Sequence, residues 1–290
     1  MNKASEKKTD LIVFPEATIG GYPKHSTFGI QVGLRTDSGR QEYLLYYNAS
    51  IEVPSPTTDT LAQLAKETNM SVVIGVIERE RGTLYCTLLY IDAVAGLIGK
   101  HRKIMPTGAE RLVWGFGDES TIAVHDMTLP SLQNVNGHGN KAKVSGVICW
   151  ENYQPLLRYH MYRQGTQIYT APTVDARTTW LPSMQFIAQE GRCFVLSACA
   201  FAKKEDFPAD HAAQQAPDDI IIAGGSCIIS PLGEVLAGPL REEAGLLFAE
   251  IDLDDNIRGA LDMDVTGHYS RSDIFQLHVK GYPEDKSKAV

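Results

Sequence analysis

The sequence has few cysteines, and none is placed as a metal or redox pair. There are five, an odd number, with no Cys-x-x-Cys pair and no histidine at the spacing of a zinc ligand. This pattern argues against a structural metal and favours a reducing compartment. The five are Cys86, Cys149, Cys193, Cys199 and Cys227.

Positive charge is also in short supply. The chain has 27 Lys and Arg against 35 Asp and Glu, which gives a formal net charge of −8 and a pI near 5.5. Binding to the phosphates of nucleic acid depends on clustered Lys and Arg. A nucleic-acid partner is therefore not expected.

Long apolar runs are missing as well. No stretch approaches the roughly 18 apolar residues of a membrane span, and residues 1–10 are charged and lack the apolar core of a signal peptide. We therefore expect a soluble, cytoplasmic protein with no membrane partner. The sequence also contains no Gly-x-Ser-x-Gly motif and no phosphate-binding loop.

The chain does contain enough apolar sequence for a large core. Of its 290 residues, 43% are hydrophobic, and strand patterns alternate with helix patterns, which favours an α/β domain with parallel strands. The strands are too many for one open sheet flanked by four helices, so two packed sheets with helices outside fit better. We expect a charged segment at residues 1–10, one domain at 11–279 and a loose tail at 280–290. Strands are predicted at residues 11–14, 71–77, 84–92, 97–103, 121–124, 144–148, 168–171, 194–200, 226–229, 234–237 and 246–251, and helices from residue 56 and at 153–164, 180–192 and 254–263.

One cysteine lies where open α/β folds place their chemistry. The apolar run at residues 144–148 leads into Cys149, and a helical pattern follows at residues 153–164. Its sulfur is therefore expected at the end of a strand, where such folds bind ligands. The alternative for a single cysteine is a small buried apolar residue.

Two other segments carry charged groups that suit a reactive thiol. Glu16 follows the apolar run at residues 11–14, and Lys103 and Glu110 belong to the segment 99–111. A nearby ammonium lowers the pKa of a thiol and stabilises developing negative charge, and a carboxylate can carry protons. Each charge alone is also explained as a solvated surface group.

These segments and their order resemble the signature regions of the nitrilase, or carbon-nitrogen hydrolase, superfamily. The resemblance extends from about residue 11 to residue 275, and its Cys-Trp-Glu and Pro-Thr-x-x-Glu-Arg motifs are most similar to those of the nitrilase branch. The matching segments are Phe14-Pro15-Glu16-Ala17, Gly21-Tyr22-Pro23, Arg102-Lys103, Pro106-Thr107, Glu110-Arg111, Cys149-Trp150-Glu151-Asn152, Tyr169-Thr170-Ala171-Pro172-Thr173, Gly224-Gly225-Ser226 and Gly267-His268-Tyr269-Ser270-Arg271.

The resemblance implies a four-layer α-β-β-α sandwich with no metal and no organic cofactor. Cys149 would be the nucleophile, Glu16 the general base and acid, and Lys103 the cation that stabilises the tetrahedral species. Glu110 would orient either Lys103 or the attacking water. The backbone N–H of Trp150 would help to hold the developing negative charge.

The implied reaction converts an organic nitrile into a carboxylic acid and ammonia through a thioimidate and a thioester on the cysteine. An amidase, or a hydratase acting on cyanide or a nitrile, is the alternative on the same residues. A third possibility is a truncated, inactive homologue that only forms oligomers. Family members usually begin with a strand and a helix before the Phe-Pro-Glu strand, whereas residues 1–10 are all that precede it here, so we expect a truncated form whose sheet lacks that first strand.

Expectations for the pocket and the partners also follow from the resemblance. Tyr22, Trp150 and Pro172 are the predicted substrate-binding residues, although packing explains the aromatic residues equally well. His101, between two basic residues, is expected at the surface. A small nitrile is the expected substrate. The chain is expected to form a homo-oligomer (a dimer, a higher oligomer or a spiral) through exposed helix faces and the loop around Trp114.

Overall fold

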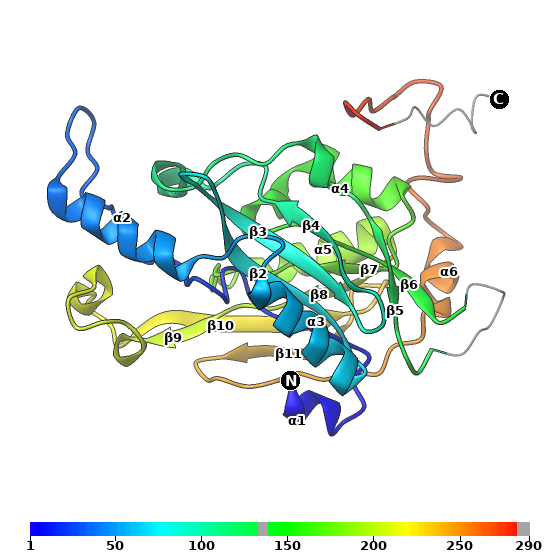
Figure 1. Ribbon diagram of the computed structural model, residues 1–290. Helices are drawn as coiled ribbons and strands as arrows, with labels where there is room; N and C mark the ends of the chain where they lie inside the picture. Colours follow the sequence, from blue (N-terminus) through cyan, green and yellow to red (C-terminus); the bar gives the residue numbers. More distant parts are fainter. Residues whose placement is uncertain (133–138, 283–290) are drawn as a thin grey trace.

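The computed structural model describes residues 1–132 and 139–282, which form two sheets packed face to face with helices outside (Figure 1). The part of the predicted C-terminal tail at residues 283–290 lies outside the described residues. In the described part of the chain, no helix combines the length and the apolarity needed to cross a bilayer.

The first sheet has four strands in the order β1-β2-β3-β4. β1 runs parallel to β2, and the other two pairs are antiparallel. β2 lies between two layers and is buried on both faces: Val72, Ile74 and Val76 enter one apolar layer, and Val73 and Ile77 enter the other. The strands are β1 (Leu11–Val13), β2 (Ser71–Glu80), β3 (Thr83–Asp92) and β4 (Gly96–Arg102).

The second sheet has the order β11-β10-β8-β7-β6-β5, and β9 pairs with β10 beside this path. The centre, β6 to β8, is parallel, as the alternation of strands and helices predicts, and the other pairs are antiparallel. The strands are β5 (His125–Thr128), β6 (Lys141–Gly146), β7 (Ile168–Thr170), β8 (Phe194–Ser197), β9 (Phe201–Lys203), β10 (Ile220–Ile229) and β11 (Val235–Arg241).

Helices cover the outer face of each sheet. α3 contacts the first sheet, with Pro56 at its first position, while α4 and α5 contact each other and α5 packs on the second sheet. The α-helices are α1 (Asn2–Ser5), α2 (Asp37–Ala49), α3 (Pro56–Thr68), α4 (Pro155–Arg163), α5 (Trp180–Gly191) and α6 (Asp254–Ala260). The 3₁₀ helices are η1 (Gly108–Leu112), η2 (Glu119–Thr121), η3 (Cys149–Tyr153), η4 (Lys204–Asp206) and η5 (Ala212–Gln215).

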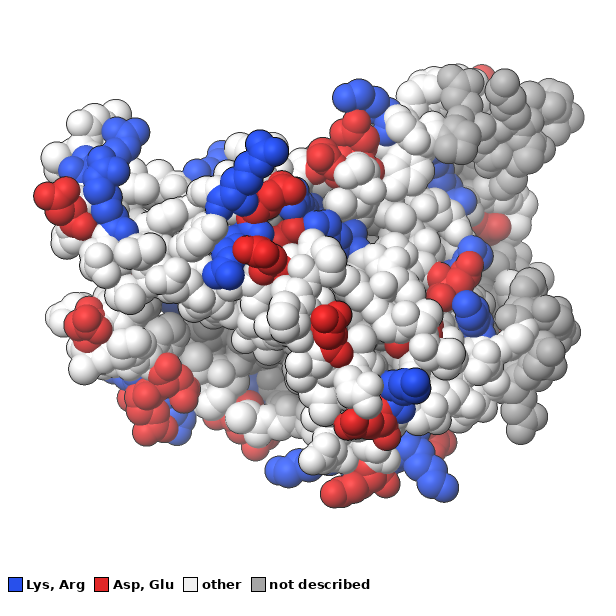
Figure 2. Space-filling view, viewed as in Figure 1, with Lys and Arg blue, Asp and Glu red and all other residues white. Residues whose placement is uncertain are grey.

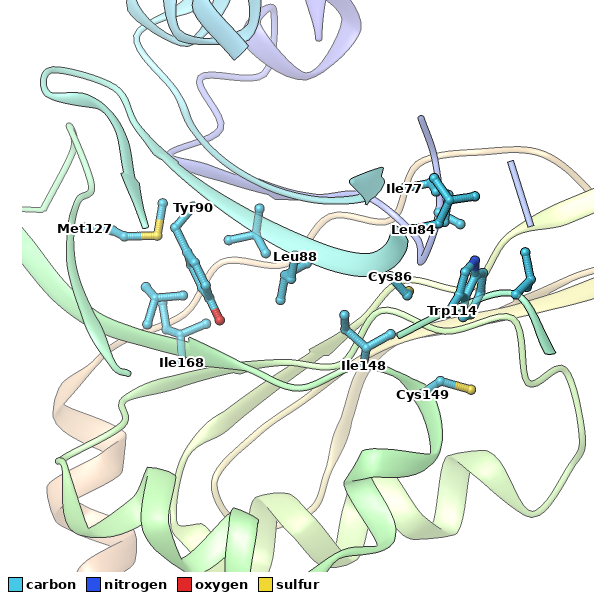
Figure 3. Close-up of a cluster of buried hydrophobic side chains, with 14 of the residues drawn as sticks. Ile77, Leu84, Cys86, Leu88, Tyr90, Trp114, Met127, Ile148, Cys149 and Ile168 are labelled. Atoms are coloured by element: carbon cyan, nitrogen blue, oxygen red, sulfur yellow. The ribbon is translucent and has the colours of Figure 1, made fainter. Parts of the chain in front are cut away.

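Three apolar layers hold these elements together, which makes the fold the predicted four-layer α-β-β-α sandwich. One layer lies between the two sheets, one between the first sheet and α3, and one between the second sheet and helices α4 and α5. In the layer between the sheets, Cys86, Trp114, Ile148 and Cys149 lie at one end (Figure 3).

Two predicted strands are wrong. Residues 246–251 form no strand, because they pair with neither sheet and a ladder needs a hydrogen-bonding partner. Residues 121–124 belong to η2 and an irregular stretch, and the strand β5 begins one residue later, at His125. Residues 1–10, predicted only as a charged segment, contain α1, whose Ala4 is buried against the first sheet.

Candidate active site

Cys149 lies at a sharp turn just beyond β6. It has a φ of 53°, in the left-handed region that is unfavourable for a residue with a side chain, and such strain often occurs at functional sites. Hydrogen bonds fix the turn: the Cys149 N–H donates to Pro172 O at 2.9 Å, and Asn152 Nδ2 donates to Cys149 O at 2.7 Å. The Thr173 hydroxyl donates to Cys149 Sγ at 3.2 Å. The predicted place at a strand end is confirmed.

Glu16, Lys103 and Glu110 form a buried chain of charges. Lys103 Nζ lies 2.8 Å from Glu16 Oε1 and 2.8 Å from Glu110 Oε2, and the Glu16 and Lys103 side chains are fully withdrawn from solvent. Ala17, directly after Glu16, also has a positive φ, of 54°. Segments far apart in the sequence therefore meet at one point, as predicted.

The two carboxylates differ in how many donors they receive. Glu110 has a donor on each oxygen: Tyr22 Oη donates to its Oε1 at 2.8 Å, and both Lys103 Nζ and the Thr107 N–H donate to its Oε2. Glu16 receives the Lys103 ammonium on Oε1, whereas its Oε2 is buried with no hydrogen-bond partner among the described residues. Of these two carboxylates, only Glu16 therefore has an oxygen without a donor among the described residues.

Electrostatics keep the resting thiol protonated. Burial and the Glu16 charge raise the pKa of Cys149, against the lowering effect of Lys103 and of the Thr173 hydroxyl. Burial also raises the pKa of Glu16 above its ordinary 4.5, although Lys103 opposes this. For Lys103, burial lowers the pKa, but the surrounding negative groups, Glu16 first, raise it well above 10.5 overall. The thiol consequently needs a base before it can attack.

Glu151 lies two positions after Cys149, and its hydrogen bonds connect the turn at Cys149 with the segment that contains Lys103. Its carboxylate accepts the N–H of Ile148 and the N–H of Ile104, both at 2.7 Å, and lies 2.9 Å from His101 Nε2. The prediction that His101 is a surface residue is wrong, since it is buried on this carboxylate. Trp114, whose loop is expected to make contacts between copies of the chain, is likewise buried, and its ring centroid lies 5.6 Å from that of Tyr22.

A cavity of about 460 Å³ opens onto Cys149. Tyr22 and Trp150 contribute to its wall, together with Glu110 and Cys149, but Pro172 does not line it. Pro172 instead lies behind the turn and accepts the Cys149 N–H. The lining is Tyr22, Lys24, Thr107, Glu110, Cys149, Trp150, Val174, Asp175, Ala176, Arg177, Ile220, Ile221, Ile222 and Ala223.

The wall of this cavity is fixed by residues that the sequence did not single out. Trp150 Nε1 donates to Asp175 Oδ2 at 2.9 Å. The Arg177 guanidinium binds the same carboxylate, and its Cζ lies 4.6 Å from the centroid of the Trp150 ring. Asp175 and Arg177 lie two and four residues after Thr173, the end of the matching segment 169–173. That proximity is the only sequence signal that could have indicated them.

In the described part of the chain, a second hollow, the possible metal ligands and the surface charge give no other site that brings together the predicted catalytic residues. A hollow of about 520 Å³ beside α2 is lined by Arg35, Arg40 and Arg111, and none of the four predicted catalytic residues lines it. Over residues 1–132 and 139–282, no group of three or more His, Cys, Asp and Glu could hold a metal ion. On the face in Figure 2, acidic and basic side chains are interspersed among uncharged ones.

The sequence is similar to those of known proteins over most of its length. A family model described as carbon-nitrogen hydrolase matches residues 1–258. The chain is 54% identical to an arylacetonitrilase of Trametes versicolor, over 96% of this chain and 88% of that protein. It is 51% identical to a nitrilase of Bradyrhizobium diazoefficiens, over 98% and 85%, and 46% identical to a bifunctional nitrilase/nitrile hydratase of Nicotiana tabacum, over 97% and 79%.

A solved structure shares the fold at low sequence identity. A carbon-nitrogen hydrolase from Helicobacter pylori superposes with a TM-score of 0.70 at 17% identity, covering 94% of this chain and 87% of that one. At this identity the likeness concerns the fold alone.

Proposed function

The chain belongs to the carbon-nitrogen hydrolase family, and from this premise we propose that it is a nitrilase that converts an organic nitrile into a carboxylic acid and ammonia through a covalent intermediate on Cys149. The observation that carries the proposal is the buried Glu16–Lys103–Glu110 chain beside a strained cysteine at the floor of a cavity. Relatives between 45% and 54% identical over nearly the whole chain bear nitrilase names.

The first step forms the carbon–sulfur bond. Glu16, through its free Oε2, takes the proton of the Cys149 thiol while the sulfur adds to the nitrile carbon. The nitrile nitrogen gains negative charge, and the proton held by Glu16 passes to it, giving a neutral thioimidate. Lys103 stabilises that charge as it develops.

The next steps consume two waters. Glu16 takes a proton from the first water as its oxygen adds to the thioimidate carbon, and returns a proton to the nitrogen so that ammonia leaves and a thioester remains. The second water adds in the same way, and the carbon–sulfur bond breaks to release the acid and the thiol. The free Trp150 N–H, which has no partner among the described hydrogen bonds, can donate to the oxyanion.

Glu110 orients Lys103 and does not transfer protons. Both of its oxygens already accept hydrogen bonds, Oε1 from Tyr22 and Oε2 from Thr107 and Lys103. Of the two roles that the sequence left open, orienting the lysine therefore fits better than activating water.

The first substrate class to test is the arylacetonitriles. The relative that is 54% identical carries the name arylacetonitrilase, and the Tyr22 and Trp150 rings on the cavity wall offer apolar contact to an aryl group. The test is ammonia release from phenylacetonitrile, benzonitrile and an aliphatic nitrile, with the Cys149→Ser variant as control. We expect the variant to keep its circular dichroism spectrum and to lose activity by about 10⁴-fold or more.

Amide formation is the second candidate function. A relative that is 46% identical is named a bifunctional nitrilase/nitrile hydratase. Amide arises when the thiolate, rather than ammonia, leaves the first tetrahedral species. Chromatographic yields of acid and amide from the same nitrile separate the two outcomes, and hydrolysis of amides alone would identify an amidase instead.

A homo-oligomer is the assembly we propose. Leu156 on α4 and Phe186 on α5 are both exposed, and their helices pack against each other, so a second copy can cover them. Sedimentation velocity of wild type and of a Leu156→Asp, Phe186→Asp variant tests this. A folded protein that self-associates but turns over no nitrile or amide would support the inactive oligomer-forming alternative.

The location we propose is the cytoplasm. All five cysteines are free thiols in the described residues, and a reducing compartment maintains that state. Fractionation of cells that express the tagged chain tests the location.

A further inference from the structure

Cys86, which the mechanism does not use, contacts the side chain of Glu16 and the backbone of Lys103. Its Sγ lies 3.5 Å from Glu16 Oε1, and its backbone oxygen accepts the Lys103 N–H at 2.8 Å. It lies on β3 with its side chain in the layer between the sheets, at the same end as Cys149 (Figure 3), and it is almost fully buried.

We propose that Cys86 is a positioning residue, whose thiol fixes the carboxylate of Glu16 so that Oε1 binds Lys103 and Oε2 stays free to exchange protons with Cys149 and water. This inference rests on the proposed function, because it assigns a partner to the base of that reaction.

The geometry explains why a second donor on the same oxygen matters. The terminal torsion of a glutamate is broad, so a carboxylate held by one ammonium can turn and share that ammonium between both oxygens. Oε1 of Glu16 receives two donors, Lys103 Nζ at 2.8 Å and the Cys86 thiol at 3.5 Å. Both lie on one oxygen, which keeps the carboxylate plane fixed and the other oxygen without a partner.

The thiol also affects the protonation of the base. Burial raises the pKa of Glu16, and donation from Cys86 is among the contacts that lower it. Removing the donor should therefore raise the pKa of Glu16. Since the base acts when ionised and is lost as the pH falls through its pKa, the acidic limb of the activity profile should move to higher pH.

The alternative is that Cys86 has only a packing role in the core, as buried cysteines often do. Cys193 is the matched control, because it is equally buried but lies in the layer between the second sheet and its helices. Serine at position 86 keeps a donor, whereas alanine removes it.

The experiment compares Cys86→Ala, Cys86→Ser and Cys193→Ala with wild type. The readouts are kcat/KM for a nitrile across pH and, independently of any substrate, the rate at which iodoacetamide alkylates Cys149, mapped by mass. We expect Cys86→Ala to lower kcat by about tenfold with little change in KM and to move the acidic limb of both profiles to higher pH. Cys86→Ser should stay close to wild type, and Cys193→Ala should leave both limbs in place.

If the acidic limbs of the pH profiles stay in place in Cys86→Ala, or move equally far in Cys193→Ala, the positioning role of Cys86 is overturned. A wild-type enzyme that turns over no nitrile would instead overturn the proposed function. In that case the alkylation profiles of the same variants still decide the role of Cys86, because they need no substrate.

Discussion

Lys103 Nζ lies 2.8 Å from Glu16 Oε1, although 87 positions separate the two residues in the chain and neither side chain reaches solvent. A buried pair of this kind keeps both groups charged only while both are present. The pair thus supplies a cation for developing negative charge and a carboxylate with one free oxygen, beside the same thiol.

The pH dependence of the reaction should follow Glu16. Because burial raises the pKa of Glu16 above 4.5, kcat/KM should fall on acidification with an apparent pKa above that value. On the alkaline side, the pKa values of Cys149 and Lys103 are both raised, so activity should persist to pH 9.0. A pH profile of kcat/KM from 4 to 10 checks both limbs, and a Glu16→Gln variant that keeps the acidic limb would contradict the assignment.

Tyr22 should contribute through Glu110. Its hydroxyl donates to Glu110 Oε1 at 2.8 Å, and a hydrogen bond to a charged group contributes about 1.5–3 kcal/mol. Tyr22→Phe should therefore lower kcat/KM by about tenfold or more. Tyr43→Phe is the control, since that hydroxyl donates to Gly82 O away from the site. Equal kinetics for the two variants would argue against the role of Tyr22.

Glu151 should stabilise the nucleophile turn. Its carboxylate accepts two backbone N–H groups and contacts the His101 ring, and breaking such a buried network costs about 3–5 kcal/mol. Glu151→Gln turns an amide NH₂ towards one of these donors, so the free energy of unfolding in urea should fall by an amount of that order. Glu190→Gln, in the more exposed pair with Arg158, serves as control and should lose less. If the two variants lose similar amounts of unfolding free energy, Glu151 does not stabilise the Cys149 turn more than an ordinary ion-pairing residue would.

Gly75 should be needed for the position of Glu16. A Cβ on Gly75 would meet Pro15 O at 2.4 Å and Glu16 Cα at 2.7 Å, both backbone atoms that cannot move aside cheaply. Gly75→Ala should displace Glu16 and lower kcat/KM by about 10²-fold. Gly82→Ala is the matched control because a Cβ there meets no atom within 4 Å. Full activity in Gly75→Ala would show that the base tolerates a shifted backbone.

The sequence predicted that Glu16, Lys103 and Cys149 lie at strand ends because each of them lies in a short motif that follows an apolar run. Glu16 follows β1, Lys103 follows β4, and Cys149 follows β6 after two apolar residues. Apolar runs locate such strands, and strand ends locate the chemistry of α/β folds. The contacts among these groups are not local, so the sequence alone could not show which oxygen of Glu16 is free or that Cys86 binds the other.

His101 was misplaced because neighbours in a strand face opposite sides. Lys100 and Arg102 both bind the Glu78 carboxylate on one side of β4, and His101, between them, points to Glu151 on the other. Two flanking charges therefore say nothing about the residue between them. The error at residues 246–251 has another cause, since an apolar run predicts a strand but cannot supply the neighbouring strand that a ladder requires.

The central claim is that the Cys149 sulfur forms a covalent bond with the carbon of a nitrile. The most direct test is intact mass of the protein, quenched in acid during turnover of phenylacetonitrile, followed by peptide mapping. The account predicts an adduct with the mass of the thioimidate or acyl group on the peptide that contains Cys149, and none in Cys149→Ser. Turnover without any adduct on this peptide, or full activity in Cys149→Ser, would contradict it.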